Sequence, residues 1–265
     1  MPICWLEAGM DKGKSKYIII TPYFKESEKL LRRCIDSVNE QSVPCNHLLI
    51  ADGFPQDWID DEDVRHLKLD GAHGDLGNTA RGVGALLAIA EEYEGIGLLD
   101  ADNWLESDHA ELCLEAANKY AGGIGNCDFV IASRFIRRAD ETIMPIAEEP
   151  GHVDTSCFFF LPGSYAFLPH WASMPKVTSA IGDRVFNALI KAKSLTSART
   201  RRRSVNYLSL YRSHYEALGE VPPADAKSQA IFAPIELLKD IKSSREVDIV
   251  NRLIGFEFLK TEGKS

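Results

Sequence analysis

The chain has few cysteines, no paired cysteine motif and no long apolar run. Only six of its 265 residues are cysteine, and no two of them form a Cys-x-x-Cys pair. A disulfide framework or a zinc knuckle is therefore not expected, and reduced cysteines fit the cytoplasm. No stretch is apolar over the length needed to cross a bilayer, and the first residues lack the basic and apolar regions of a secretory signal. The sequence predicts a cytoplasmic protein without a transmembrane segment.

Positive charge is also in deficit. Against 39 aspartates and glutamates there are 30 lysines and arginines, so the formal net charge is −9. A surface of this sign repels phosphate, and nucleic acid is therefore not expected as a partner. An anionic substrate would need a local cation to offset the repulsion. The hydrophobic fraction of 45% and the charged fraction of 26% are those of an ordinary globular protein.

Apolar runs alternate with amphipathic segments through the first half of the chain. The runs predict buried strands, and they cover residues 17–22, 47–51, 96–99 and 129–132. The amphipathic segments predict helices, and they cover residues 26–41, 78–92 and 107–120. This alternation predicts an α/β fold with a doubly wound, mainly parallel central sheet flanked by helices.

The second half has less regular patterns. It predicts strands or a hairpin over 153–168, a short helix over 182–193, a basic loop over 199–203, a strand over 205–211 and C-terminal helices over about 225–265. No internal repeat, low-complexity linker or domain boundary is evident, so we expect a single domain over residues 1–265.

Three motifs common in α/β enzymes are missing. The first predicted strand does not run into a glycine-rich turn, and Gly82–Gly84 lies inside a helical pattern without the third glycine of a dinucleotide fingerprint. A Walker A loop and a Gly-x-Ser-x-Gly nucleophile elbow are absent as well. These absences argue against dinucleotide binding, P-loop chemistry and an α/β-hydrolase.

Three predicted strands end in polar or turn residues, at 21–23, 52–53 and 100–102. The carboxyl ends of parallel strands share one edge of a sheet, and ligands bind there. Asp100 and Asp102 offer hard oxygen ligands for Mg²⁺ or Mn²⁺, and such an ion would bridge diphosphate oxygens. Each residue taken alone also has a plainer interpretation, because Asp-Gly is a common turn and Asp102 can cap the turn that follows.

Together these segments resemble family 2 glycosyltransferases of the GT-A fold. The resemblance covers about Tyr17–Lys193 and rests on five segments in the order of the family: Ile20–Glu26, Ile50–Gly53, Gly77–Arg81, Leu98–Asn103 and Ala180–Phe186. The family commonly has two acids before the glycine at the second strand end, and here Ala51 replaces the first. The resemblance implies a nucleotide-binding half at about 16–104 and an acceptor half at about 105–215.

The resemblance also implies an activity. Such an enzyme transfers a sugar from a nucleoside diphosphate sugar, often UDP-sugar, to an acceptor hydroxyl, assisted by Mn²⁺ or Mg²⁺ and with inversion at the anomeric carbon. The residues at matching positions are Thr21, Pro22, Tyr23, Asp52, Arg81 and Asp100 for nucleotide and donor binding, Asp102 for the metal and Asp183 for the catalytic base. Asp183 opens a predicted helix, where capping is its plainer role.

Three further assignments complete the expected site. Asp154 lies where the family places residues that face donor sugar and acceptor, and it is either a ligand for a sugar hydroxyl or a buried turn acid. His214 either completes the metal sphere or is a structural histidine. The cluster Arg199–Arg203 is either a mobile loop that closes over the diphosphate or meets a phosphate-bearing acceptor, or a solvated charge run.

Two other functions stay open at this point. A sugar-phosphate nucleotidyltransferase also uses acids at strand ends and a metal, but it would need a glycine-rich basic loop after the first strand, and Thr21–Glu26 does not supply one. The second alternative is a non-catalytic relative that binds a nucleotide-sugar. The sequence leaves the acceptor unknown, and peripheral membrane contact is compatible with it.

Overall fold

The computed structural model describes residues 15–120, 123–146, 153–224, 226–227, 248, 251–252 and 255–258. Its strands are β1 (Tyr17–Tyr23), β2 (Cys45–Asp52), β3 (Arg65–Leu69), β4 (Gly95–Leu98), β5 (Trp104–Leu105), β6 (Phe129–Arg137), β7 (Ile143–Met144), β8 (Phe158–Phe160) and β9 (Ser197–Leu208). Its helices are α1 (Glu28–Asn39), α2 (Asn78–Ala90), α3 (His109–Lys119), α4 (His170–Ser173), α5 (Gly182–Ala192) and α6 (Arg212–Glu216). The predicted C-terminal helices lie almost entirely outside the described residues.

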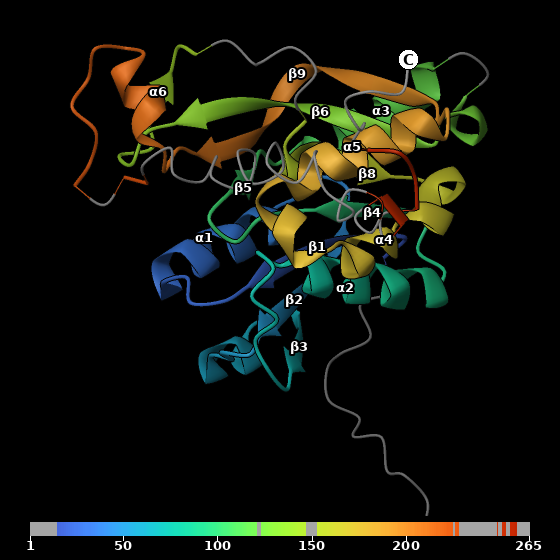
Figure 1. Cartoon of the computed structure of the whole chain (residues 1–265), viewed down its shortest axis with the longest axis horizontal. Coiled ribbons are helices and arrows are strands. Elements are labelled where there is room, and N and C mark those ends of the chain that lie inside the picture. The colour runs from blue at the N-terminus through green and yellow to red at the C-terminus, as the bar shows by residue number, and fades with distance from the viewer. Residues whose placement is uncertain are drawn as a thin grey trace, which may run out of the picture.

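The described strands form one nine-stranded sheet in the order β3-β2-β1-β4-β8-β6-β9-β5, with β7 paired to β6. The first four strands of this order are parallel. β8 then runs antiparallel to both β4 and β6, and β9 runs parallel to β6. Figure 1 shows the strands stacked from β3 at the bottom to β9 at the top, with helices on the faces. The predicted α/β sheet, mostly parallel and flanked by helices, is confirmed.

The parallel half is buried on both faces, which explains its apolar runs. Ile18, Ile19 and Ile20 in β1 are at most 1% exposed. Side chains alternate between the two faces along the strand. Thr21 contacts Cys34 of α1, whereas Ile20 lies against Gly84 of α2, so the two helices cover opposite faces of β1. Odd-numbered residues of β1 therefore point toward α1, and even-numbered residues point toward α2.

The second half departs from the expected elements. Strands or a hairpin were expected over 153–168, and this segment contains one short strand, β8, between 3₁₀ turns and no hairpin. The expected basic loop is also wrong, because Arg199–Arg203 lies within β9. The β6–β9 register shifts around Ser133, opposite this segment, and such an irregularity lets consecutive arginines face solvent. The sequence patterns also missed β3, an edge strand of partly exposed residues.

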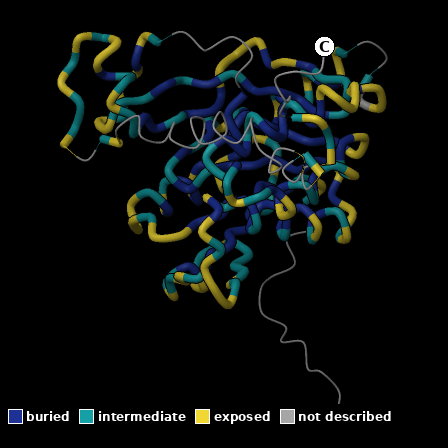
Figure 2. Tube along the Cα trace, in the orientation of Figure 1, coloured by how far each residue is buried: buried dark blue, intermediate teal, exposed yellow. Residues whose placement is uncertain are grey.

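Aromatic residues fill the core beside β8. Phe158, Phe159 and Phe160 are completely buried, and Trp171 of α4 stacks on Phe186 of α5 with ring centroids 4.8 Å apart. Figure 2 shows buried residues along the central strands and exposed ones on the outer turns. The five cysteines in the described ranges are free thiols, as expected. Among the helices of these ranges, none combines the length and apolarity required to cross a membrane.

Candidate functional site

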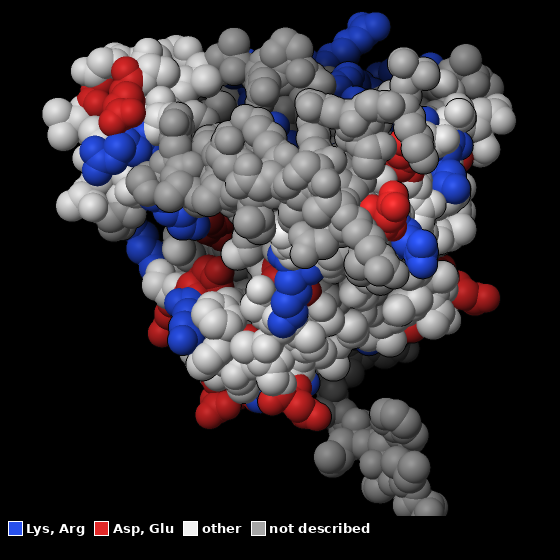
Figure 3. Space-filling view, viewed as in Figure 1, with Lys and Arg blue, Asp and Glu red and all other residues white. Residues whose placement is uncertain are grey.

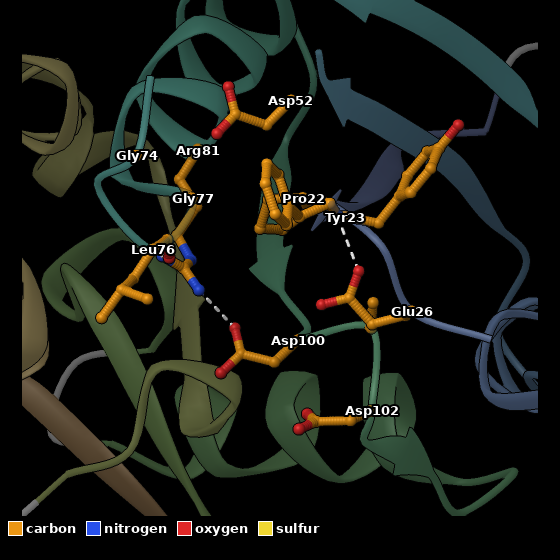
Figure 4. Close-up of a pocket in the computed structure, with 12 residues that line it drawn as sticks. Pro22, Tyr23, Glu26, Asp52, Gly74, Leu76, Gly77, Arg81, Asp100 and Asp102 are labelled. Carbon is orange, nitrogen blue, oxygen red and sulfur yellow. Dashed lines mark hydrogen bonds and ion pairs between the residues drawn. The ribbon is translucent and has the colours of Figure 1, made fainter. Parts of the chain in front are cut away.

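The predicted strand ends meet in one pocket. This strand-end pocket has a cavity volume of about 340 Å³ and lies where β1, β2 and β4 end. Figure 4 shows its side chains converging from the strand ends, the loop before α2 and the first turn of α2. Its lining consists of Pro22, Tyr23, Phe24, Glu26, Asp52, Gly74, Leu76, Gly77, Arg81, Asp100, Ala101 and Asp102.

A second pocket adjoins the first. This α5 pocket, of about 210 Å³, is bounded by the start of α5 and by the chain after β9. Its lining consists of Leu76, Asn78, Arg81, Asp100, Asp102, Asp154, Thr155, Ser179, Ala180, Gly182, Asp183, Tyr207, Leu208, Leu210, Tyr211 and Lys227. Four residues, Leu76, Arg81, Asp100 and Asp102, line both pockets, so the two form one cleft. Asp52, Asp102 and Asp183 therefore face a common space.

Arg81 holds the junction between the pockets. Its Nη2 donates to Asp100 Oδ1 at 2.5 Å, and its Nη1 donates to the Leu76 carbonyl at 2.9 Å and to Asn78 Oδ1 at 3.2 Å (Figure 4 marks the Asp100 pair). The Arg81 side chain is only 7% exposed. Arg81 is therefore a buried side chain and not a solvated helix charge, and its ion pair with Asp100 links α2 to the end of β4. The short side chain of Asp100 is oriented by this pair.

Neighbouring residues at the end of β1 point to opposite faces of the sheet. Pro22 faces the pocket, and Gly77 approaches it so closely that an added Cβ would lie 2.9 Å from the proline ring. Thr21 points to the opposite face, where its Oγ1 bonds His47 Nε2 at 2.8 Å, and it lines neither pocket. The expectation that Thr21 binds the donor is thus not met by its position, because alternation along the strand turns it into the core.

Tyr23 lines the strand-end pocket but does not offer its ring to it. The side chain is buried, its hydroxyl bonds His66 Nε2 at 2.7 Å, and it accepts from the Gln56 amide at 3.0 Å. Figure 4 shows the ring directed away from Arg81 and Asp100. Nucleotide and donor binding was expected of Tyr23, and these hydrogen bonds of its hydroxyl make the side chain a support of the β1 end.

Asp52 is oriented by a histidine that the sequence analysis did not identify. The Asp52 side chain is 5% exposed, and its Oδ1 bonds both the backbone N–H and Nδ1 of His73, at 3.0 and 2.6 Å. The turn with His73 reaches Asp52 because Gly53 has a φ of +83°, and an added Cβ there would lie 2.4 Å from Ala72 N. The separation of 21 residues carries no local pattern, so only the fold brings this pair together.

Asp102 is the most electrostatically perturbed acid of the cleft. Burial, and then the charge of Asp100, raise the pKa of Asp102 to about 7. Its backbone carbonyl accepts from Arg33 Nη2 at 2.7 Å, which fixes the turn after β4. Within the described ranges no group of three or more His, Cys, Asp or Glu side chains is arranged to hold a metal ion. Mg²⁺ often takes only one or two carboxylates and completes its shell with substrate oxygens, and Asp100 with Asp102 fits that smaller donor set.

Asp154 is buried and lies on the wall of the cleft, and its role as a ligand for a sugar hydroxyl stays a prediction. It is a buried turn acid whose Oδ1 accepts from the Ser156 amide at 3.0 Å, and it also lines the α5 pocket. Arg134 lies 3.2 Å from its Oδ2, and the guanidinium is 4.9 Å from the centre of the Tyr207 ring. Burial outweighs the arginine and raises the pKa of Asp154 to about 6.

Asp183 stands in the first turn of α5, on the wall of the α5 pocket. Its Oδ1 accepts from the Arg184 amide at 2.7 Å. The start of α5 lies against the start of α2, since a Cβ on Gly182 would be 2.9 Å from the Asn78 amide nitrogen. Two helix N-termini therefore border the cleft, and their dipoles partly offset its carboxylates.

Two expected contributors lie outside the cleft. His214 is in α6, bonds Ser209 Oγ through Nδ1 at 2.8 Å and lines neither pocket. Arg199–Arg203 also lines neither pocket, and Figure 3 shows basic side chains projecting from the upper edge where β9 runs. The prediction that this segment is a loop closing over the diphosphate is therefore wrong. The arginine cluster also no longer supports a phosphate-bearing acceptor. The sequence analysis missed other residues of the cleft: Glu26, Asn78, Tyr207, Tyr211 and Lys227.

Neither a protein-family model nor a curated protein matches this sequence. Solved structures do match. S. aureus TarS 1–349 in complex with UDP aligns with 91% of this chain and 72% of its own, with a TM-score of 0.54 and 11% identity. The same fragment in complex with UDP-GlcNAc aligns with 93% of this chain and 74% of its own, with a TM-score of 0.54 and 14% identity. At these identities the likeness shows the fold, which this chain shares with the TarS structures. The predicted GT-A type is thus confirmed at the level of fold, and membership of family 2 stays a prediction.

Proposed function

We propose that the protein transfers a sugar from a nucleoside diphosphate sugar to an acceptor hydroxyl. The observation that carries this proposal is the single cleft that Asp52, Asp102 and Asp183 line together with the Arg81–Asp100 pair. The similar structures of TarS were solved with UDP and UDP-GlcNAc, which supports a nucleotide-sugar as the donor and makes UDP the favoured nucleotide.

The strand-end pocket is proposed to bind the nucleoside. Asp52 supplies a carboxylate at the end of β2 that can accept an N–H of the base, and His73 keeps that carboxylate in place. Pro22 and Leu76 supply apolar contact area in the same pocket. Asp100, held by Arg81, can accept from a ribose hydroxyl at the junction. In this arrangement Asp52 binds the base and Asp100 binds the ribose, each by accepting a hydrogen bond.

Asp102 and Asp100 are the residues that would hold Mg²⁺ or Mn²⁺. A bound divalent cation would neutralise charge on the diphosphate and help it to leave. Without a cation, burial and the charge of Asp100 raise the pKa of Asp102 to about 7, so its carboxyl is only partly ionised near neutral pH. Ionised Asp102 is therefore expected together with a bound cation.

Asp183 is proposed as the base of the transfer. As the acceptor oxygen forms its bond to the anomeric carbon, the bond from that carbon to the diphosphate oxygen breaks, and the acceptor proton passes to the Asp183 carboxylate. The Arg184 N–H orients one oxygen of this carboxylate. Attack on the face of the anomeric carbon opposite the departing diphosphate would invert the anomeric configuration.

A thermal-shift panel tests the donor class. UDP, GDP, CDP and dTDP are each added to the full chain with Mn²⁺ and with chelator. One diphosphate is expected to stabilise the protein, by about 2.7 kcal/mol at a hundredfold excess over its dissociation constant. Melting temperatures that do not change with any of the four would contradict the proposal.

Turnover separates the proposed enzyme from a non-catalytic binding relative. Hydrolysis or transfer from UDP-GlcNAc, followed by UDP release, is expected for the unsubstituted protein. UDP binding without any release from a set of sugar donors would instead support the binding relative. Cytoplasmic location and peripheral membrane contact stay predictions.

A further inference from the structure

The cleft has more acids than a diphosphate would tolerate without additional positive charge. Asp100, Asp102, Asp154 and Asp183 all line the α5 pocket. Arg81 is already engaged with Asp100 and with the Leu76 carbonyl, and its side chain is only 7% exposed. It can therefore do little to attract a further anion.

Lys227 is a cation of a different kind on the same wall. It lines the α5 pocket and is exposed, and within the described part of the chain its ammonium has no hydrogen bond or ion pair. Its positive charge lowers the pKa of the Asp102 carboxyl, which burial and the charge of Asp100 raise. An exposed ammonium beside buried carboxylates is available to an incoming ligand.

The backbone of Lys227 is anchored although its side chain is not. Its N–H donates to the Leu210 carbonyl at 2.6 Å, and its own carbonyl accepts from the Arg212 N–H at 3.0 Å. These bonds form a parallel bridge between Tyr211 and Lys227. The root of the side chain is thus held next to the pocket residues Leu210 and Tyr211, so that binding a ligand costs mainly the entropy of one side chain.

We propose that Lys227 binds the diphosphate of the donor at the α5 side of the junction. The inference rests on the proposed function and assigns the role that the sequence analysis gave to Arg199–Arg203. A lysine suits this role because its ammonium is a compact charge with three rotatable donors and can follow phosphate oxygens as they move. It also meets the negative charge that develops on the diphosphate as the bond to the sugar breaks.

Pyrophosphate and uridine, used as probes, divide the nucleotide into its two parts. Binding of UDP, pyrophosphate and uridine to the full chain is measured by calorimetry and ligand-observed NMR, with Mg²⁺ and with chelator. The variants are Lys227→Met, Lys227→Arg and the matched control Arg212→Met, which removes a nearby charge that lines neither pocket. Pyrophosphate makes the test independent of the base.

In Lys227→Met the affinities for UDP and pyrophosphate are expected to fall about tenfold in chelator, which is the size of a lost charge-assisted hydrogen bond. Uridine affinity is expected to stay unchanged, Lys227→Arg to retain most of the pyrophosphate affinity, and Arg212→Met to match the unsubstituted protein.

Unchanged UDP and pyrophosphate binding in Lys227→Met would overturn the inference and leave the proposed function intact. A parallel loss of uridine affinity would also overturn it, since the lysine would then only support the pocket. A third contrary result is tighter Mg²⁺ binding with unchanged pyrophosphate affinity, which would make the lysine only a counter-ion to Asp102. If the unsubstituted protein binds none of the diphosphates, the proposed function itself fails.

Discussion

The two pockets of the cleft are built in different ways. The strand-end pocket comes from residues 22–102, which lie at the ends of adjacent parallel strands and in the loop before α2. The α5 pocket draws on residues from 76 to 227, and these come together through β8, which runs antiparallel to β4 and β6, and through β9, which pairs parallel with β6. The strand-end pocket follows from local sequence patterns, whereas Asp154 and Asp183 of the α5 pocket were expected only from the family resemblance and Lys227 was not expected at all.

The pockets also differ in chemistry. Pro22, Leu76 and Ala101 give the strand-end pocket apolar surface around Asp52. The α5 pocket shares Asp100 and Asp102 with it and adds Asp154, Asp183 and the exposed Lys227. We therefore expect substitutions in the first to change nucleoside affinity, and substitutions in the second to change phosphate binding or turnover.

The largest effect is expected for Asp183→Asn in the α5 pocket. Loss of the base should lower the transfer rate about 10³-fold, within the range for general-base catalysis, and leave UDP affinity unchanged. Product formation and UDP binding are measured on the same preparation. Glu111→Gln is the control, because Glu111 is also an acid in the first turn of a helix and lines neither pocket. Equal loss of binding and rate would contradict a role for Asp183 in turnover alone.

Arg81→Met should remove the ion pair with Asp100, which lies where the two pockets meet. It leaves Asp100 without its partner in a largely buried position, so we expect the free energy of unfolding to fall by about 3 kcal/mol. Denaturant titration measures this value. The double variant Arg81→Met/Asp100→Asn should recover part of the loss, and Lys119→Met, from an exposed helical pair, should show little change. No recovery in the double variant would mean that packing, and not charge, makes Arg81 important.

The stability of the metal-free protein should depend on pH through Asp102. The pKa of its carboxyl is raised to about 7 in the folded protein, so the folded state holds this proton more tightly than the unfolded chain. The associated stability is fully present below about pH 4 and lost as pH rises through about 7, on the order of 2 kcal/mol after allowing for partial exposure.

Asp102→Asn is expected to weaken this dependence, as measured by melting temperature between pH 4 and 8 in chelator. Asp154 leaves a smaller slope in the same direction, because its pKa is raised to about 6. Identical pH profiles for the variant and the unsubstituted protein would contradict the burial of Asp102.

His73→Ala should have the smallest effect, confined to the strand-end pocket. Asp52 keeps its bond to the backbone N–H of residue 73 but loses the one to the imidazole. We expect affinities for uridine and UDP to fall together by about fivefold, near 1 kcal/mol, with the rate at saturating donor unchanged. His170→Ala, whose histidine bonds the Phe167 carbonyl outside both pockets, is the control. A change in saturated rate without a change in affinity would contradict a positioning role.

Much of the fold and part of the site could be predicted. The runs at β1, β2 and β4 are apolar because both faces of these strands are buried, and their polar ends predicted the meeting of Asp52, Asp100 and Asp102. Treating the strand end as a unit overlooked that Thr21 points away from Pro22 and the pocket, since neighbouring residues of a strand point to opposite faces. His214 was misassigned because no local pattern shows where α6 lies after β9.

The order of apolar and polar residues determined the parallel half of the sheet and the acids at its edge, because burial of strand faces and exposure of strand ends are local properties of the chain. The tertiary structure alone decided that Lys227 lines the cleft, that His73 orients Asp52 and that Arg199–Arg203 lies away from it. Those relations depend on how strands far apart in the chain pair, and strand pairing is set by packing of the whole core rather than by any short segment.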